Sequence, residues 1–223
     1  MNNETNEHHE SNEAFYDRIS NAYDLIADSS EREARITGEK ALELKAGERV
    51  LEIGFGTGNT LIDLLETVGD SGQVTGIDVS TGMRDVAERK LKQHPLGDHV
   101  QLTVGDARQM PFEDESFDAV FTSFTLELFP EGDIEAVLSE VKRILVKDGR
   151  LGVVSMAEVK EGDHPSLLEK GYIWMHRHFP HLVDCRPIDP AAYVTQAGLK
   201  LQQQIDLKVW TMPVAVVVAS KDF

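Results

Sequence analysis

The sequence predicts an α/β fold with a mostly parallel sheet, and three observations point to it. Apolar runs suited to strands alternate with amphipathic stretches suited to helices over most of the 223 residues. The first run, Val50–Ile53, passes into a glycine-rich turn, as expected where a strand bends sharply into a helix. Three successive runs end in an acid, at Glu52, Asp78 and Asp106. Because the carboxyl ends of parallel strands meet at one edge of a sheet, we expect these acids to converge there.

Composition removes several function classes. The chain is 41% hydrophobic and 27% charged, with a net charge of −17. This acidic total argues against nucleic acid as the partner, because nucleic-acid binders generally carry a basic patch that neutralises phosphates. No apolar run approaches the roughly 20 residues of a membrane helix, and the acidic N-terminus does not resemble a signal peptide. The expected location is therefore the cytoplasm. The single cysteine, Cys185, excludes an internal disulfide framework and a thiolate-cluster metal site.

The first 46 residues divide into two parts. Residues 1–13 carry almost no apolar side chains and are expected to form a disordered acidic tail. Residues 14–46 have helical periodicity, with apolar side chains such as Phe15 and Ile19 at three- and four-residue spacing. A second helical piece is expected there from about residue 31 to 44.

The glycine-rich turn follows a strand expected over 48–53 and distinguishes two classes of ligand. Its glycines alternate with other residues, at Gly54, Gly56 and Gly58. Glycine allows the backbone to approach a ligand closely, and the N–H groups at the start of the next helix, expected over 59–68, suit a polar or anionic group. A dinucleotide-binding turn reads G-x-G-x-x-G, but Asn59 stands where its third glycine would be.

The next strand supplies an acceptor for a nucleoside. It is expected over 73–77 and ends at Asp78, 20 residues beyond Gly58. At that distance a strand-end carboxylate accepts hydrogen bonds from both hydroxyl groups of a ribose. A charged helix is expected to follow over 84–92.

The rest of the chain completes the sheet. A short strand over 100–104 runs into Asp106, and an irregular, aromatic-rich stretch occupies 157–190. Two β-rich runs over 199–219 are expected to form a terminal antiparallel hairpin. The elements expected between these points are a strand over 119–122, a helix over 133–146, a turn at 147–149, a strand over 150–156 and a helix over 189–197.

Several stretches together resemble the class I S-adenosylmethionine (SAM) dependent methyltransferases. The form E-x-G-x-G-x-G beginning at Glu52 resembles the first motif of that family, and the phrase at 110–118 resembles its approach to strand four. The N-terminal phrase at 15–24 looks like the lid segment of the UbiE-type methyltransferases, which make menaquinone and ubiquinone. The resemblance implies a Rossmann-like, seven-stranded, mostly parallel sheet with helices on both faces and a C-terminal antiparallel hairpin. It implies a single domain over 14–223.

The resemblance also implies SAM as the methyl donor and S-adenosylhomocysteine (SAH) as the product. Glu52 would lie near the amino group of the methionine moiety, Asp78 on the ribose and Asp106 on the exocyclic amino group of adenine. The residues implied to bind the cofactor are Glu52, Gly54, Phe55, Gly56, Gly58, Asp78, Val79, Met83, Asp106, Ala107 and Ser123.

Two residues are candidates for catalysis. Tyr23 belongs to the part of the lid that lies close to SAM in relatives, although it equally fits simple packing of a helix on the sheet. Glu127 departs from the S-F-G-L-R-N-like run of UbiE-type enzymes, which Ser123, Phe124 and Leu126 match. A carboxylate there can act as a general base or hold a cationic acceptor. Acids at helix starts are also common, because they suit the helix dipole.

The insertion at 157–190 is where this family usually builds acceptor specificity, so it is expected to act as a cap. Its aromatic cluster suits an apolar or cationic acceptor. The candidate acceptor-binding residues are Tyr172, Trp174, His176 and Phe179. The spacing of His176, His178, His181 and Cys185 fits no standard zinc signature, so cap packing is preferred and no metal is expected.

The predicted activity is transfer of the methyl group of SAM to a small, apolar or aromatic acceptor, with a quinone-like ring as one candidate, by a monomer or a homodimer. An NAD-type oxidoreductase is disfavoured by the glycine spacing and by Glu52. A non-catalytic SAM-binding subunit stays open. Methylation of a nucleic-acid amino group is disfavoured, since no N/D-P-P-Y/F/W run follows strand four.

Overall fold

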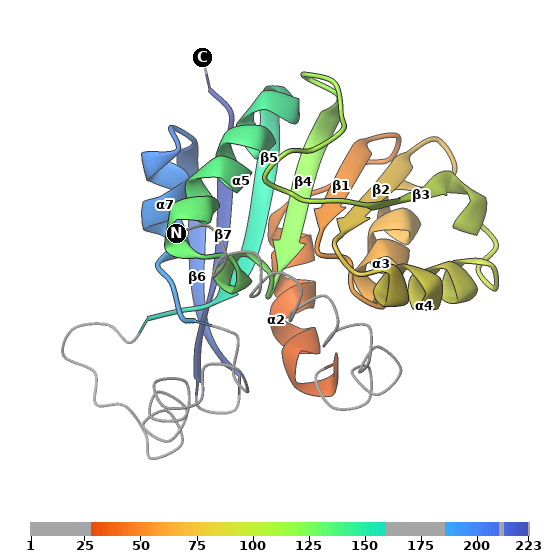
Figure 1. Ribbon diagram of the computed structural model, residues 1–223, viewed down its shortest axis with the longest axis horizontal. Helices are drawn as coiled ribbons and strands as arrows, with labels where there is room; N and C mark the ends of the chain where they lie inside the picture. The colour runs from red at the N-terminus through yellow and green to blue at the C-terminus, as the bar shows by residue number, and fades with distance from the viewer. Residues whose placement is uncertain (1–27, 159–185, 210–211, 223) are drawn as a thin grey trace, which may run out of the picture.

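The computed structural model describes residues 28–158, 186–209 and 212–222. Its strands are β1 (Arg49–Ile53), β2 (Gln73–Asp78), β3 (Val100–Val104), β4 (Phe117–Ser123), β5 (Leu145–Met156), β6 (Lys200–Val209) and β7 (Met212–Ser220). They form one seven-stranded sheet in the order β3-β2-β1-β4-β5-β7-β6 (Figure 1). The first five strands pair in parallel, and β7 runs antiparallel to both β5 and β6. The predicted mostly parallel sheet with a terminal hairpin is confirmed.

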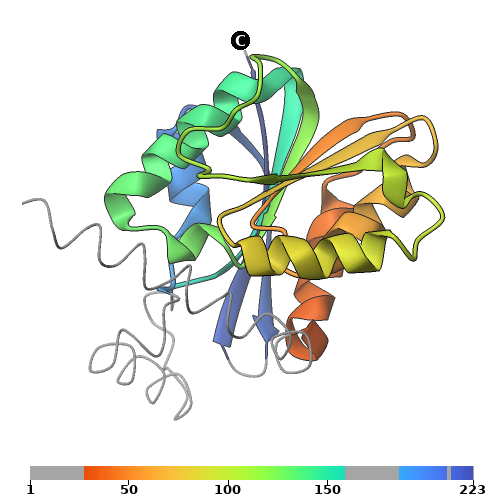
Figure 2. The same ribbon diagram turned by 45° about the vertical axis from the view of Figure 1, so that its right-hand side comes forward.

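Helices cover both faces of this sheet, as predicted. They are α2 (Asp28–Ala41), α3 (Asn59–Val68), α4 (Thr81–Leu91), α5 (Glu131–Ile144) and α7 (Pro190–Gln196), with short 3-10 turns η1 (Gly97–His99) and η2 (Leu126–Leu128). One buried apolar cluster joins α2, α3 and α4 to the sheet, and a second joins α5 and α7 to its other face. Figure 2 shows α5 and α2 on opposite sides of the strands.

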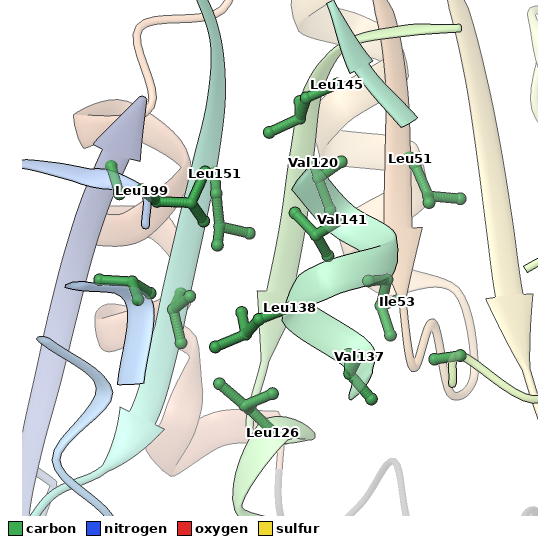
Figure 3. Close-up of a cluster of buried hydrophobic side chains, with 14 of the residues drawn as sticks. Leu51, Ile53, Val120, Leu126, Val137, Leu138, Val141, Leu145, Leu151 and Leu199 are labelled. Carbon is green, nitrogen blue, oxygen red and sulfur yellow. The ribbon is translucent and has the colours of Figure 1, made fainter. Parts of the chain in front are cut away.

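The cluster under α5 illustrates how periodicity places the core. Apolar residues of α5 recur at three- and four-residue spacing and are fully buried, among them Val137, Leu138 and Val141. They pack on alternate residues of the central strands, such as Leu51 of β1 and Val120 of β4 (Figure 3). Each such side chain contributes about 1.5–3 kcal/mol by leaving water, so this layer fixes α5 against the sheet.

Most element boundaries lie within three residues of the sequence prediction, and two of the differences have a clear structural reason. Helix α4 begins at Thr81, three residues early, because the Ser80 side chain caps it by accepting a hydrogen bond from the Met83 N–H at 3.1 Å. The turn expected at 147–149 lies inside the span of β5. The ladder with β4 jumps there from Leu145 to Arg150, so the intervening residues leave the sheet.

Of the predicted lid segment 14–46, the structure describes residues 28–46, and helix α2 forms residues 28–41 of that part. It lies at the end of the sheet toward which the arrows of β4 and β5 point (Figure 1). Gly38 allows the close approach, because a Cβ there would overlap the side chain of Val154 on β5 and come within 3.1 Å of Phe121 on β4. The tail 1–13 and Tyr23 lie outside the described residues, as does most of the predicted cap.

Candidate functional site

Hydrogen bonds join three strand ends at the carboxyl edge of the sheet. The Gly54 N–H after β1 donates to the Ile77 carbonyl of β2 at 2.8 Å, and the Gly56 N–H donates to the Asp78 carboxylate at 2.9 Å. Beyond β3, the Gly105 N–H donates to the Asp78 carbonyl at 2.9 Å. The glycine turn and the ends of β2 and β3 therefore form one connected rim.

The three glycines of the turn have positive φ angles of 73°, 50° and 85°, which glycine adopts without strain. A Cβ on Gly54 would overlap the side chain of Thr125, and one on Gly58 would lie 2.9 Å from Cβ of Ala87. The neighbouring side chains therefore leave room only for glycine at these two positions. A Cβ on Gly56 would meet nothing within 4 Å, so this residue faces open space. The protein therefore leaves room for a ligand on this side of the turn.

Asp78 lies beside the open glycine. Its two carboxylate oxygens accept hydrogen bonds from the Gly56 N–H and the Ser80 N–H, each at 2.9 Å. A carboxylate oxygen can accept more than one hydrogen bond, so this geometry fits the expected contact with ribose hydroxyls. The neighbouring residues differ in exposure, since Val79 is 40% exposed and Met83 is 3% exposed.

Glu52 is a buried carboxyl group at the end of β1. It is 2% exposed, and burial raises its pKa well above the usual range, against the opposing effects of a Thr60 hydrogen bond and the Arg35 charge. Its Oε2 atom has no hydrogen-bond partner among the residues that the structure describes. A buried carboxyl oxygen without a donor is costly. An ammonium group, such as the one expected on SAM, would supply that donor, so the site fits the cofactor.

Asp106 is held by a residue that the sequence analysis did not single out. The Nε atom of Arg108 lies 3.0 and 2.9 Å from the two carboxylate oxygens of Asp106, and its Nη1 lies 2.5 Å from Asp133 of α5. These bonds raise the pKa of the Arg108 guanidinium. They orient Asp106 at the rim beside Ala107, which is buried. The only signal in the sequence is an arginine two positions after the acid.

The stretch after β4 carries the predicted reaction centre. Ser123 is half-buried, and Phe124 has a φ of 51°, which is uncommon for a residue with a side chain. Glu127 in η2 is 1% exposed, and its Oε1 accepts a hydrogen bond from the Met156 N–H of β5 at 2.9 Å. Glu127 therefore fixes η2 to the end of β5, whatever further role it has.

Helix α2 adds two charged residues that the sequence analysis also missed. Arg35 is 9% exposed, and its Nε lies 3.7 Å from Oε1 of Glu39. Burial first, and then the Asp63 charge, raise the pKa of Glu39 to about 7, while Arg35 opposes the shift. No pattern marks these residues in sequence, because only the packing of α2 brings them to Glu52.

The remaining predicted residues fall elsewhere. Those of the lid and the cap lie outside the described residues, namely Tyr23, Tyr172, Trp174, His176 and Phe179. Within the described part of the chain, no group of three or more histidine, cysteine, aspartate or glutamate side chains is arranged to hold a metal ion. None of the helices in that part is long and apolar enough to cross a membrane.

Comparisons with known proteins agree with this geometry. A family profile described as "Methyltransferase domain" matches residues 50–149. A demethylmenaquinone methyltransferase of Lactobacillus johnsonii is 36% identical over 195 residues, which cover 86% of this chain and 76% of that protein. One of Alkalihalophilus pseudofirmus is 33% identical over 143 residues, or 64% of this chain and 59% of that protein.

Solved structures share the fold. A SAM-dependent methyltransferase from Aquifex aeolicus superposes with a TM-score of 0.67 at 21% identity, covering 92% of this chain and 97% of that one. At that identity the match concerns the fold alone. The seven-stranded, Rossmann-like architecture expected from the sequence is the one found.

Proposed function

The chain belongs to the class I SAM-dependent methyltransferases, and on that premise we propose that its acceptor is a small apolar or aromatic molecule, with a quinone-like ring as the leading candidate. Relatives at 31% to 36% identity are named for demethylmenaquinone, which is a quinone. The names of these relatives are the main observation that supports a quinone-like acceptor. Because the chain belongs to this family, the alternative of an NAD-type oxidoreductase is set aside.

In this proposal SAM lies over Gly56, with its ribose on Asp78, its ammonium group at Glu52 and its adenine amino group at Asp106. The open side of Gly56 and the unpartnered oxygen of Glu52 support the placement. Arg108 keeps Asp106 oriented at the rim. The other proposed cofactor-binding residues are Gly54, Phe55, Gly58, Val79, Met83, Ala107 and Ser123.

SAM supplies a sulfonium methyl group that an acceptor atom displaces in line. The residues of this chain bind and align SAM and the acceptor and exclude water from them. Such a transfer needs alignment and exclusion of water more than acid–base power. Glu127 is proposed either as the base toward an acceptor O–H or as an orienting residue, and its bond to Met156 favours the second role. Tyr23 is proposed to act from the lid.

The lid over 14–46 and the cap over 157–190 are proposed to enclose the acceptor. The position of α2 at the carboxyl edge of the sheet supports the first of these. The cap contribution rests on Tyr172, Trp174, His176 and Phe179. If Tyr23→Phe and Trp174→Ala both leave turnover and acceptor affinity unchanged, this enclosure is wrong.

The direct test is a methylation assay. The purified protein is incubated with SAM and a short-chain demethylmenaquinone, and SAH and the mass of the quinone are followed. We expect the quinone to gain one methyl group, and Asp78→Ala to abolish most turnover. The matched control is Asp70→Ala, which removes an exposed acid between α3 and β2. SAH binding without quinone methylation would refute the acceptor class, and absence of SAH binding would refute the site.

A further inference from the structure

Two turns at the carboxyl edge of the sheet meet through one side chain. The cofactor turn, residues 54–58, follows β1, and the reaction-centre turn, residues 123–128, follows the body of β4. The ladder between these two strands ends before either turn begins. Beyond it, the three atoms that a Cβ on Gly54 would meet first all belong to the side chain of Thr125, namely Oγ1, Cγ2 and Cβ. Thr125 therefore limits how closely the two turns approach each other.

The backbone around Thr125 is held in an unusual conformation. Phe124 has a φ of 51°, which residues with a side chain rarely adopt and which persists only where the surroundings enforce it. Here the Phe124 N–H donates to the Val154 carbonyl of β5 at 2.8 Å. The Thr125 hydroxyl donates to the Ser123 carbonyl at 3.0 Å, which fixes the orientation of the half-buried side chain. The contact with Gly54 is thus a fixed one.

The sequence differs from the UbiE-type run at this position. That run, S-F-G-L-R-N, has glycine where this chain has Thr125, and a glycine there would place no side chain between the turns. Glu127, the other departure, binds the same turn to the Met156 N–H of β5. One departure thus fixes the reaction-centre turn to β5, and the other holds it against the cofactor turn.

We propose that Thr125 is a positioning residue that sets the distance between the methyl group of SAM and the acceptor. The inference rests on the proposed function, in which SAM lies over Gly56 and the acceptor lies beside Glu127. The spacing of the two turns is then also the spacing of donor and acceptor. In-line displacement depends on that spacing, and a misplacement of about 1 Å can lower the rate about 100-fold. Thr125 acts through its contact with Gly54.

The first test separates the rate from cofactor affinity. Thr125→Ala removes Oγ1 and Cγ2, so the single-turnover rate with SAM and a short-chain demethylmenaquinone should fall about 100-fold, while SAH affinity by calorimetric titration should fall far less. Thr125→Val keeps the branched shape and loses the hydrogen bond to Ser123, so its rate should fall no more than about tenfold. The control Thr67→Ala removes an exposed hydroxyl that likewise donates to a backbone carbonyl, that of Asp63, and should behave as wild type.

The second test needs no acceptor. Gly54→Ala places a Cβ against the Thr125 side chain, and Thr125→Gly removes that side chain. Gly54→Ala should therefore lower the melting temperature by roughly 2–12 °C more in the wild type than in Thr125→Gly. The matched control is Gly69→Ala, where φ is 66° and a Cβ meets nothing within 4 Å. It should have the same effect in both backgrounds.

Three results would overturn the proposal. They are a near-wild-type rate or a proportionate loss of SAH affinity in Thr125→Ala, equally low rates in Thr125→Val and Thr125→Ala, and equal effects of Gly54→Ala in both backgrounds. A wild type that binds SAH but methylates no quinone would refute the acceptor class instead, and the thermal comparison would still decide whether Thr125 sets the spacing of the turns. Absence of SAH binding would remove the cofactor placement and this inference with it.

Discussion

Gly56→Ala should separate cofactor binding from folding. The added Cβ meets no protein atom within 4 Å, so it costs no packing. The φ of 50° is left-handed, which costs an alanine about 1–2 kcal/mol, and at about 2–4 °C per kcal/mol the melting temperature should fall by roughly 2–8 °C. The methyl group would enter the space proposed for SAM. Overpacking of that kind costs about 1–3 kcal/mol, or roughly a five- to 150-fold weaker affinity.

Calorimetric titration with SAH measures this effect, and thermal unfolding measures the stability. The matched control is Gly69→Ala at the end of α3, where φ is 66° and a Cβ again meets nothing within 4 Å. It should lose stability of the same order, about 1–3 kcal/mol, and bind SAH normally. Wild-type SAH affinity in a folded Gly56→Ala protein would show that the cofactor does not lie over this turn.

Three further predictions concern carboxyl groups. Asp78→Ala should weaken SAH by about 1.5–3 kcal/mol in the same titration, and an unchanged affinity would contradict the ribose contact. Burial raises the pKa of Glu39 to about 7, so its contribution to stability is present below pH 4.5 and is lost as pH rises through 7. Glu39→Gln should therefore be more stable than wild type by about 1–3 kcal/mol at pH 8 but not at pH 4. Thermal unfolding at both pH values would reveal the difference. Glu127→Gln keeps an acceptor for the Met156 N–H, so it should fold. Its rate of methyl transfer should fall at least about 100-fold if Glu127 is the base, whereas a near-normal rate would assign it an orienting role.

Structural features that follow from local spacing were predictable. These features are the glycine turn, the strand end at Asp78 and the alternating core residues. Each follows from a short spacing pattern that can be read directly from the sequence. The boundary of α4 was missed because it depends on one capping bond from Ser80. The start of β5 at Leu145 was missed because that residue was assigned to the end of the preceding helix, and only its pairing with Phe117 of β4 places it in the sheet.

Residues that act through tertiary packing were not predictable. Arg108 is two positions from Asp106, but its second partner, Asp133, belongs to a helix on another part of the chain. Arg35 and Glu39 precede Glu52 by more than a dozen residues, and nothing periodic connects them to it. Their buried state follows from the depth at which α2 packs, which a single sequence does not encode in any short pattern.

That depth depends on Gly38. The missing side chain lets α2 rest directly on Phe121 and Val154, one residue before Glu39 and three after Arg35. Any larger residue at position 38 would overlap these side chains and push the helix away from the sheet. That displacement would open a path for water to the buried charges. The burial of Arg35 and Glu39 beside Glu52 thus depends on the absence of a side chain at Gly38.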